Sequence, residues 1–358
     1  MKTLAFSGCL AGAIDCDVHN AVPSVKVLYP YLSDYWQDFM AEAGDPSLEP
    51  NYYPVNSAIA ARPEARGAGF PPGADPEALI AQVLDRTGAK RAILNCLYGV
   101  PALYNEYWAA AMASAVNDWV ADAWLSRDPR LSASIVVAPQ SPDAAVAEIE
   151  RRAADGRFVQ VLLPARTQMP VGRRYYWPIY EAAARHGLPV CIHAGGGGAG
   201  QPPTPAGWPT YYVEEYLAVA QGFQGQLVSL VAEGVFAKVP GLKVVFAESG
   251  FTWLPSLMWR LDKNWKGLRR EVPWVDRLPS EIIREHLRIT LQPLDEPSEL
   301  RRLVETIDHI QSDQMLLFSS DYPHWHYDAE GPLPAGLSPD AVRNLLFANA
   351  ERTYRFHA

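Results

Sequence analysis

The sequence predicts an α/β protein folded as a single (β/α)₈ barrel with one segment inserted after the first strand. Eight short apolar segments of strand length alternate with eight segments of helical pattern. The apolar segments often lack the alternation of a half-exposed strand, as expected of parallel strands buried on both faces. This arrangement favours a closed TIM barrel over an open sheet. The length of 358 residues suits one barrel with insertions, so we expect a single domain over residues 1–358.

Each expected strand is rich in Val, Ile, Leu or Phe. Segments of this composition recur along the whole chain, and their ends can be predicted only to within a few residues. In chain order the expected strands are 13–19, 91–99, 131–139, 158–165, 189–196, 242–250, 287–293 and 315–323.

The expected helices lie between these strands, and several carry recognisable ends. Ser141 and Ser338 each precede a proline, which places a capping hydroxyl before Pro at the first helical position. Gly156 and Gly187 stand where a helix must end before the next strand. In chain order the expected helices are 76–88, 105–125, 141–156, 176–187, 213–237, 254–270, 297–307 and 338–354.

Two segments do not fit the alternation. Residues 20–75, between the first strand and the first helix, are rich in Pro, Gly, Tyr and Asn, and so long a connection is usually functional or a small subdomain. We expect it to act as a lid at the barrel mouth, together with the glycine-rich residues 195–212. The alternative for the second segment is a plain surface connector.

The composition narrows the range of partners. Hydrophobic residues make up 49% of the chain, and the net charge of −9 comes without a basic cluster. We therefore expect a small-molecule substrate and neither nucleic acid nor a membrane surface. The many Tyr and Trp residues of the two inserted segments suit a flat or apolar substrate, but they would equally suit an interface in a homo-oligomer.

The cysteines and the N-terminus help to predict the cellular compartment of the protein. Cys9, Cys16, Cys96 and Cys191 form no CxxC pair, so we expect reduced thiols and a cytoplasmic protein. Residues 1–13 resemble a weak signal peptide, but cleavage there would remove the lead-in to the first strand, so a retained extension is favoured. No apolar stretch reaches the roughly 18 residues that a membrane-spanning helix needs.

Polar side chains stand at or just past the ends of the apolar strands. The carboxyl ends of all strands of a (β/α)₈ barrel meet at one mouth, where active sites lie. A single polar residue at a strand end is usually structural, but seven at one end favour a site. These seven are Asp17, His19, Arg166, His193, Glu248, Gln292 and Asp321.

Four of these residues suit a metal site. Asp17 and His19 are two positions apart, so both side chains project to the same side of the first strand. His193 on strand five adds a second imidazole, and Asp321 on strand eight adds a second carboxylate. Two imidazoles and two carboxylates suit one divalent ion, with Zn²⁺ expected first and Mn²⁺ or Fe²⁺ as alternatives.

Four motifs resemble the amidohydrolase superfamily, specifically the amidohydrolase-2 branch that includes aminocarboxymuconate semialdehyde decarboxylase. They are IDCDVH at 14–19, YYWPIYEAAARHGLPVCIHAGG at 175–196, LKVVFAESGFTWLP at 242–255 and MLLFSSDYPHWHYD at 315–328. The resemblance implies a (β/α)₈ barrel enzyme in which His19 and His193 bind the metal. It also implies that Asp321 is a ligand that exchanges a proton with substrate or with metal-bound water.

The chain departs from this pattern at two positions. Many members of the branch have H-x-H on strand one, whereas Asp17 takes the first place here; the resorcylate-type decarboxylases are closer, with E-x-H. Glu248 stands where the branch often has a catalytic histidine after strand six. The general acid or base is therefore expected to be Glu248 itself, or His324 or His326 from beyond strand eight.

Three residues are expected to contact the substrate. Arg166 is best placed to hold a carboxylate, although an ion pair with a neighbouring acid is about as well supported. Trp325 and His326 follow strand eight and are expected at the substrate. The alternative for His324 and His326 is orientation of a ligand or loop packing beside Trp325.

Three functions follow from these residues. The first is hydrolysis of an amide, ester or lactone of an aromatic or apolar substrate by metal-activated water. The alternative is non-oxidative, metal-dependent decarboxylation of an aromatic or unsaturated acid, which the carboxylate-x-His start favours. The third, a barrel that binds without catalysis, is disfavoured because all four candidate ligands are present.

Overall fold

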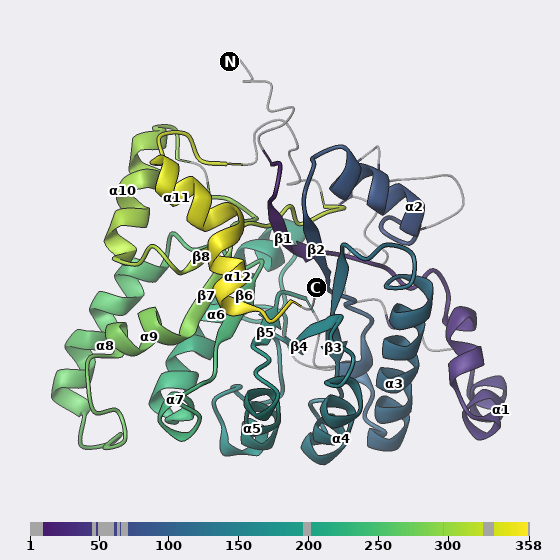
Figure 1. The fold of residues 1–358 in the computed structure, drawn as a ribbon. Helices are drawn as coiled ribbons and strands as arrows, with labels where there is room; N and C mark the ends of the chain where they lie inside the picture. Colours follow the sequence, from purple (N-terminus) through teal and green to yellow (C-terminus); the bar gives the residue numbers. More distant parts are fainter. Residues whose placement is uncertain are drawn as a thin grey trace.

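Eight parallel strands form one sheet in sequential order, surrounded by helices (Figure 1). The computed structural model describes residues 10–44, 48, 61–62, 65, 71–195, 202–295, 297–324 and 333–356. Each observed strand falls inside an expected one, so the predicted (β/α)₈ barrel is confirmed. The strands are β1 (Ile14–Val18), β2 (Arg91–Leu94), β3 (Leu131–Val136), β4 (Phe158–Pro164), β5 (Val190–His193), β6 (Val244–Ala247), β7 (Leu287–Thr290) and β8 (Leu316–Leu317).

Backbone hydrogen bonds bring β8 back to β1 and so nearly close the barrel. The Cys16 amide donates to the Phe318 carbonyl at 2.9 Å, and the His19 amide donates to the Tyr322 carbonyl at 2.8 Å. Tyr322 also forms a parallel bridge with Val18. The ends of the first and last strands, which carry candidate site residues, are thereby held side by side.

Every expected helical segment contains a helix. The first expected segment contains a short α-helix followed by a π-helical turn, and the last is divided between two α-helices by another such turn. The helices in expected segments are α2 (Pro76–Leu79), η4 (Ile80–Asp85), α3 (Glu106–Ala123), α4 (Pro142–Arg152), α5 (Trp177–Arg185), α6 (Tyr212–Ala232), α7 (Val235–Lys238), α8 (Leu254–Leu268), α10 (Leu300–Ile310), α11 (Pro339–Arg343), η7 (Asn344–Ala348) and α12 (Asn349–Thr353).

Two of the remaining helices were not expected. The helix α9 (Pro279–His286) begins on a proline at its first position and buries Ile282 and Ile283 against the barrel. The helix α1 (Asp34–Ala43) lies in the inserted segment. Shorter 3₁₀ turns occur at η1 (Val25–Tyr31), η5 (Val100–Ala102) and η6 (Arg174–Tyr176).

The inserted segment, residues 20–75, lies partly along an outer helix and partly beside the barrel mouth. Its first part packs along the outer helix α3, where the Phe39 ring lies 5.1 Å from the Trp108 ring (Figure 1). Its later part lies beside the barrel mouth: the Arg62 amide donates to the Pro323 carbonyl at 3.0 Å. Gly73 lies there too, and a Cβ on it would stand 2.7 Å from the His19 carbonyl oxygen. Much of the rest of residues 20–75, and residues 196–201 of the second expected lid, lie outside the described residues.

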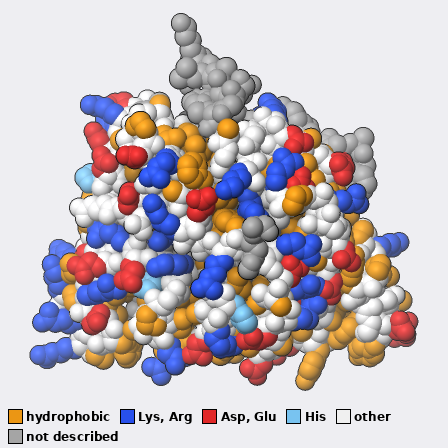
Figure 2. Space-filling model, viewed as in Figure 1, with side chains coloured by type: hydrophobic (Ala, Val, Ile, Leu, Met, Phe, Trp, Pro, Cys, Tyr) orange, Lys and Arg blue, Asp and Glu red, His pale blue; other side chains and the backbone are white. Residues whose placement is uncertain are grey.

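The surface charge and the hydropathy of the helices agree with what the composition predicts. On the face drawn in Figure 2, basic and acidic side chains are interspersed. None of the helices in the described part of the chain combines the length and the hydropathy that crossing a bilayer requires.

Candidate metal centre

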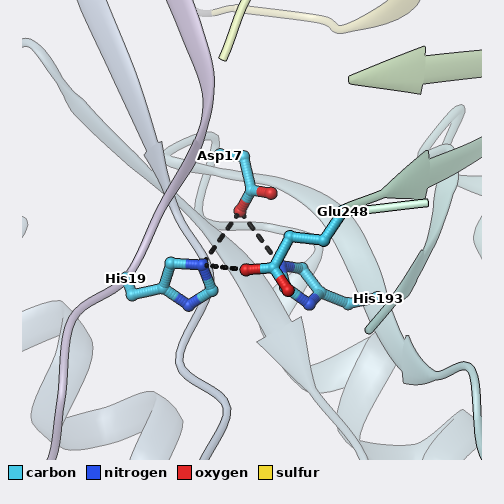
Figure 3. A group of neighbouring side chains, drawn as sticks. All are labelled: Asp17, His19, His193 and Glu248. Carbon is cyan, nitrogen blue, oxygen red and sulfur yellow. Dashed lines mark hydrogen bonds and ion pairs between the residues drawn. The ribbon is translucent and has the colours of Figure 1, made fainter. Parts of the chain in front are cut away.

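Carboxylates and imidazoles gather where four strands of the barrel end. Figure 3 shows four of these side chains facing one another. β1 and its end supply two of the residues, β5 one, the residue after β6 one, and the segment after β8 two. They are Asp17, His19, His193, Glu248, Asp321 and His324.

The first group of possible ligands joins β1, β5 and the end of β6. One donor atom from each of Asp17, His19, His193 and Glu248 lies within 4.8 Å of the others. His193 Nε2 is 3.0 Å from Asp17 Oδ1, and His19 Nε2 is 2.9 Å from Glu248 Oε1 (Figure 3). Ligands about 2.1 Å from one ion stand about 3 Å from their neighbours, so these separations suit a shared cation.

The second group shares His19 and Glu248 with the first and adds the residues after β8. His19 Nε2 lies 3.1 Å from Asp321 Oδ1. His324 Nδ1 lies 2.7 Å from the same oxygen and 3.1 Å from Glu248 Oε1. Asp321 thus stands between two imidazoles, and Glu248 contacts both of them.

The hydrogen bonds of His193 and Asp17 fit a bound cation. His193 Nδ1 is 2.7 Å from the Ala194 carbonyl oxygen, which can only accept, so this nitrogen carries a proton. In the neutral ring the lone pair on Nε2 then faces Asp17 Oδ1, a pairing that needs either a proton or a cation between them. The other oxygen, Asp17 Oδ2, is buried and has no hydrogen-bond partner among the described residues. A divalent ion bound by His193 Nε2 and by the Asp17 carboxylate would satisfy both side chains.

Burial and mutual charges shift the pKa of each imidazole. Burial and the charge on His324 lower the pKa of His19, but hydrogen bonds to Asp321 and Glu248 outweigh them and raise it to about 10. Burial lowers the pKa of His193 and of His324 as well, and the neighbouring carboxylates raise both overall. The carboxylates therefore favour a positive charge at this centre, whether a proton or a metal carries it.

The backbone is left-handed at two of the carboxylates. Glu248 and Asp321 both have a φ of 58°, a conformation that costs a side-chain-bearing residue roughly 1–2 kcal/mol. The Glu248 amide donates to Thr290 Oγ1 at 3.2 Å, and the Asp321 amide donates to the Asp17 carbonyl at 3.1 Å. These bonds to neighbouring strands hold both turns in place. Strained residues of this kind concentrate at functional sites.

Four other expected site residues are not among these possible metal ligands. Arg166 Nη1 lies 2.7 Å from Glu215 Oε1 on α6, which is the ion pair that its structural alternative required. Gln292 accepts the Leu294 amide at 2.9 Å through its own side chain and so serves its loop. Trp325 and His326 lie outside the described residues.

Tyr216 was missed in the sequence. It lies on α6, with its ring 5.7 Å from that of Tyr212. Burial raises the pKa of the Tyr216 phenol strongly, and the negative charges of Asp321 and Glu248 raise it further. The Tyr216 phenol is therefore neutral and lies near enough to Asp321 and Glu248 for their charges to act on it. The sequence did offer one indication: Tyr212 and Tyr216 are one helical turn apart, on a helix that follows the second inserted segment.

Comparison with known proteins identifies the family. The family model described as "Amidohydrolase" matches residues 14–356. Gamma-resorcylate decarboxylase of Rhizobium sp. (strain MTP-10005) is 26% identical over 262 residues, which are 69% of this chain and 76% of that protein. The hydrolysis favoured from the sequence is wrong in the light of this relative, which supports the decarboxylase alternative.

Solved structures share the fold. The 5-carboxyvanillate decarboxylase of Sphingomonas paucimobilis has a TM-score of 0.71 at 20% identity, covering 97% of this chain and 99% of that one. A dihydroxybenzoic acid decarboxylase from Polaromonas sp. JS666, solved with manganese and the inhibitor 2-nitroresorcinol, has a TM-score of 0.68 at 19% identity and covers 96% of both chains. The chain belongs to the amidohydrolase family, in its amidohydrolase-2 branch.

Proposed function

We propose that the protein is a metal-dependent, non-oxidative decarboxylase of a hydroxylated aromatic carboxylic acid. The observation that carries the proposal is the cluster of imidazoles and carboxylates at the barrel mouth, in a chain that aligns with 76% of the length of gamma-resorcylate decarboxylase. The aromatic acids named in the related structures supply the substrate class.

Asp17, His19, His193 and Asp321 are the proposed ligands of one divalent ion. Such an ion polarises the oxygens of a substrate carboxylate and of a neighbouring ring hydroxyl when it is bound. Zinc was expected from the donor set alone, but carboxylate-rich sites also suit manganese, which the Polaromonas structure contains. We therefore propose manganese first, with zinc as the competing metal.

The proposed reaction moves one proton. A proton adds to the ring carbon that bears the carboxylate, the bond to the carboxylate carbon breaks, its electron pair restores the aromatic ring, and CO₂ leaves. Asp321 is the proposed proton carrier, and His324 Nδ1, 2.7 Å from Asp321 Oδ1, replenishes it. Glu248 Oε1, 3.1 Å from the same nitrogen, stabilises the imidazolium before each transfer.

The remaining proposals concern substrate binding, domain organisation, cellular compartment and partners. Arg166 is proposed to bind the acid through N–H groups other than the one that Glu215 engages. Trp325 and His326 are kept as proposed substrate contacts. The single domain, the lid function of residues 20–75, the cytoplasmic location and the small-molecule substrate stay predictions. So do the exclusion of nucleic acid and membranes and the alternative of a homo-oligomer interface. Cys16, Cys96 and Cys191 are buried free thiols, which suits a reducing compartment.

The test is CO₂ release from a panel of hydroxybenzoates by protein loaded with Mn²⁺ or Zn²⁺. We expect release of CO₂ from at least one acid with a hydroxyl beside the carboxylate, and loss of activity on chelation. Stoichiometric metal without CO₂ release from any acid of the panel would contradict the proposal.

A further inference from the structure

Three polar side chains form a buried network beneath the metal centre. They come from the end of β2 and from the two strands that follow it, and all three are shielded from solvent. The strand register sets them side by side, because Leu94 pairs with Ala133 and Ser134 pairs with Gln160. The three residues are Asn95, Ser134 and Gln160.

The network ends on Asp17. Asn95 Nδ2 donates to Asp17 Oδ1 at 2.8 Å, and both side chains are fully buried. The backbone supports this contact, since the Asn95 amide also donates to the Val18 carbonyl at 2.8 Å. One oxygen of the carboxylate is thus anchored from below. The same oxygen lies 3.0 Å from His193 Nε2, so the bond from Asn95 fixes the carboxylate against the imidazole with which it would share a cation.

The other two residues fix the orientation of the Asn95 amide. Ser134 Oγ donates to Asn95 Oδ1 at 2.5 Å, and Gln160 Nε2 donates to the same oxygen at 3.2 Å. Gln160 Nε2 also donates to Ser134 Oγ at 2.9 Å. Because both donors occupy the carbonyl oxygen, the amide group cannot turn over, and its nitrogen must face Asp17.

We propose that Asn95 is a positioning residue for the metal ligand Asp17, held in its donor orientation by Ser134 and Gln160. The inference rests on the proposed function, since it requires Asp17 to bind the ion. Loss of a group that orients a metal ligand typically lowers metal affinity by roughly 10–100-fold. Asn95 contacts neither the ion nor the substrate in this scheme and acts through the carboxylate.

The alternative is that the network only fills the barrel interior. Buried polar groups must be satisfied wherever they occur, and losing one destabilises the fold in either case. A fall in thermal stability therefore does not separate the two roles. Metal affinity, measured beside thermal stability, does separate them.

The experiment compares Asn95→Leu with the matched control Asn117→Leu. Asn117 is also fully buried, and it bonds the Val136 backbone and Glu148 on the outer side of the barrel. Manganese affinity is measured by competition with a fluorescent chelator, and Tm is measured on the metal-free proteins. Asn95→Leu should weaken Mn²⁺ binding roughly 10–100-fold, while Asn117→Leu lowers Tm and leaves the affinity unchanged.

Ser134→Ala is the second variant, and it serves if Asn95→Leu does not fold. It removes one donor to the Asn95 carbonyl oxygen, so it should weaken Mn²⁺ binding in the same direction by a smaller factor. Raising the Mn²⁺ concentration should restore most of the activity lost in either variant.

The outcomes separate this inference from the proposed function. Wild-type affinity in Asn95→Leu, or in Ser134→Ala where the first variant does not fold, would overturn the positioning role and leave the metal site standing. Wild-type protein that binds no Mn²⁺ would overturn both proposals. Equal losses of affinity in Asn95→Leu and Asn117→Leu would show a general effect of destabilisation and also overturn the positioning role.

Discussion

Glu248 Oε1 lies 2.9 Å from His19 Nε2, with each side chain only 10% exposed. A carboxylate therefore stands against a proposed ligand, where the branch often has a histidine. Its second contact, to His324 Nδ1 at 3.1 Å, is the basis of the proposed role of Glu248 in proton exchange.

Glu248→Gln tests that role, since it keeps the shape and removes the charge. We expect kcat for CO₂ release, measured at saturating metal, to fall roughly 10²–10⁴-fold, the usual contribution of a proton-transfer group. Steady-state kinetics and elemental analysis make the measurement. Glu148→Gln, at a buried glutamate on α4, is the control and should retain wild-type kcat. An undiminished kcat in Glu248→Gln would remove Glu248 from the mechanism.

Tyr216→Phe tests the buried phenol near the carboxylates of the centre. Burial keeps this phenol protonated, so it can donate a hydrogen bond to an anionic substrate. A lost hydrogen bond to a charged group is worth about 1.5–3 kcal/mol, so KM should rise roughly tenfold or more while kcat changes little. Tyr212→Phe, one helical turn away, should have a smaller effect. Equal KM values in wild type and Tyr216→Phe would place the phenol outside the substrate site.

Arg166→Lys separates the two roles of the guanidinium. Lysine keeps the charge but loses the planar group that can bind Glu215 and a substrate carboxylate together. We expect KM for the aromatic acid to rise roughly tenfold, the loss of one charged hydrogen bond. Glu215→Gln is the companion variant and should raise KM less. If both variants lower Tm and leave KM alone, the pair with Glu215 is structural only.

His286 predicts a pH-dependent stability far from the metal centre. Burial lowers its pKa below 6.5, its Nδ1 lies 2.8 Å from the Leu242 carbonyl oxygen, and its ring stacks on Phe236. The charge on Glu285 raises the pKa, and that on Lys243 lowers it, without reversing the effect of burial. The folded protein thus holds this histidine neutral while the unfolded chain protonates it near pH 6.5.

Stability should consequently fall as the pH drops below about 6.5, by at most about 1.4 kcal/mol per pH unit from this group. The loss should stop below the folded-state pKa. His286→Asn keeps a donor for the Leu242 carbonyl and cannot titrate. Urea unfolding between pH 5 and pH 8 should show the gap between wild type and variant narrowing as the pH falls. A constant gap would contradict the assignment.

Much of the fold could be predicted because it depends on local patterns. Eight buried parallel strands leave eight apolar runs, and some helix starts carry a recognisable cap. Ser338 Oγ accepts the Ala341 amide at 3.2 Å as expected, whereas the Ser141 side chain makes no capping hydrogen bond. The helix α9 was missed because its single apolar face is short and lies between two stronger signals. The path of the inserted segment could not be predicted, since it depends on which aromatic side chains meet, such as Phe39 and Trp108.

The site could be predicted only as far as strand ends reveal it. Asp17, His19, His193 and Asp321 stand out as polar residues in apolar strands. The contact of Glu248 with two imidazoles depends on a left-handed backbone conformation, which the sequence pattern does not predict. Asn95 escaped notice because one amide within an apolar strand is usually structural, and its bond to Asp17 crosses 78 positions of the chain.

The central claim is decarboxylation, and CO₂ release from 2,6-dihydroxybenzoate and 5-carboxyvanillate measures it most directly. The first acid is gamma-resorcylate, and both acids are named in the relatives described above. Manganese-loaded wild type should release CO₂ from at least one of them, or from another hydroxybenzoate of the panel. Asp321→Asn should lose activity by roughly 10²-fold or more, because its proton carrier is gone. Release of CO₂ at the wild-type rate by Asp321→Asn, or no release by fully metallated wild type, would contradict the proposed mechanism.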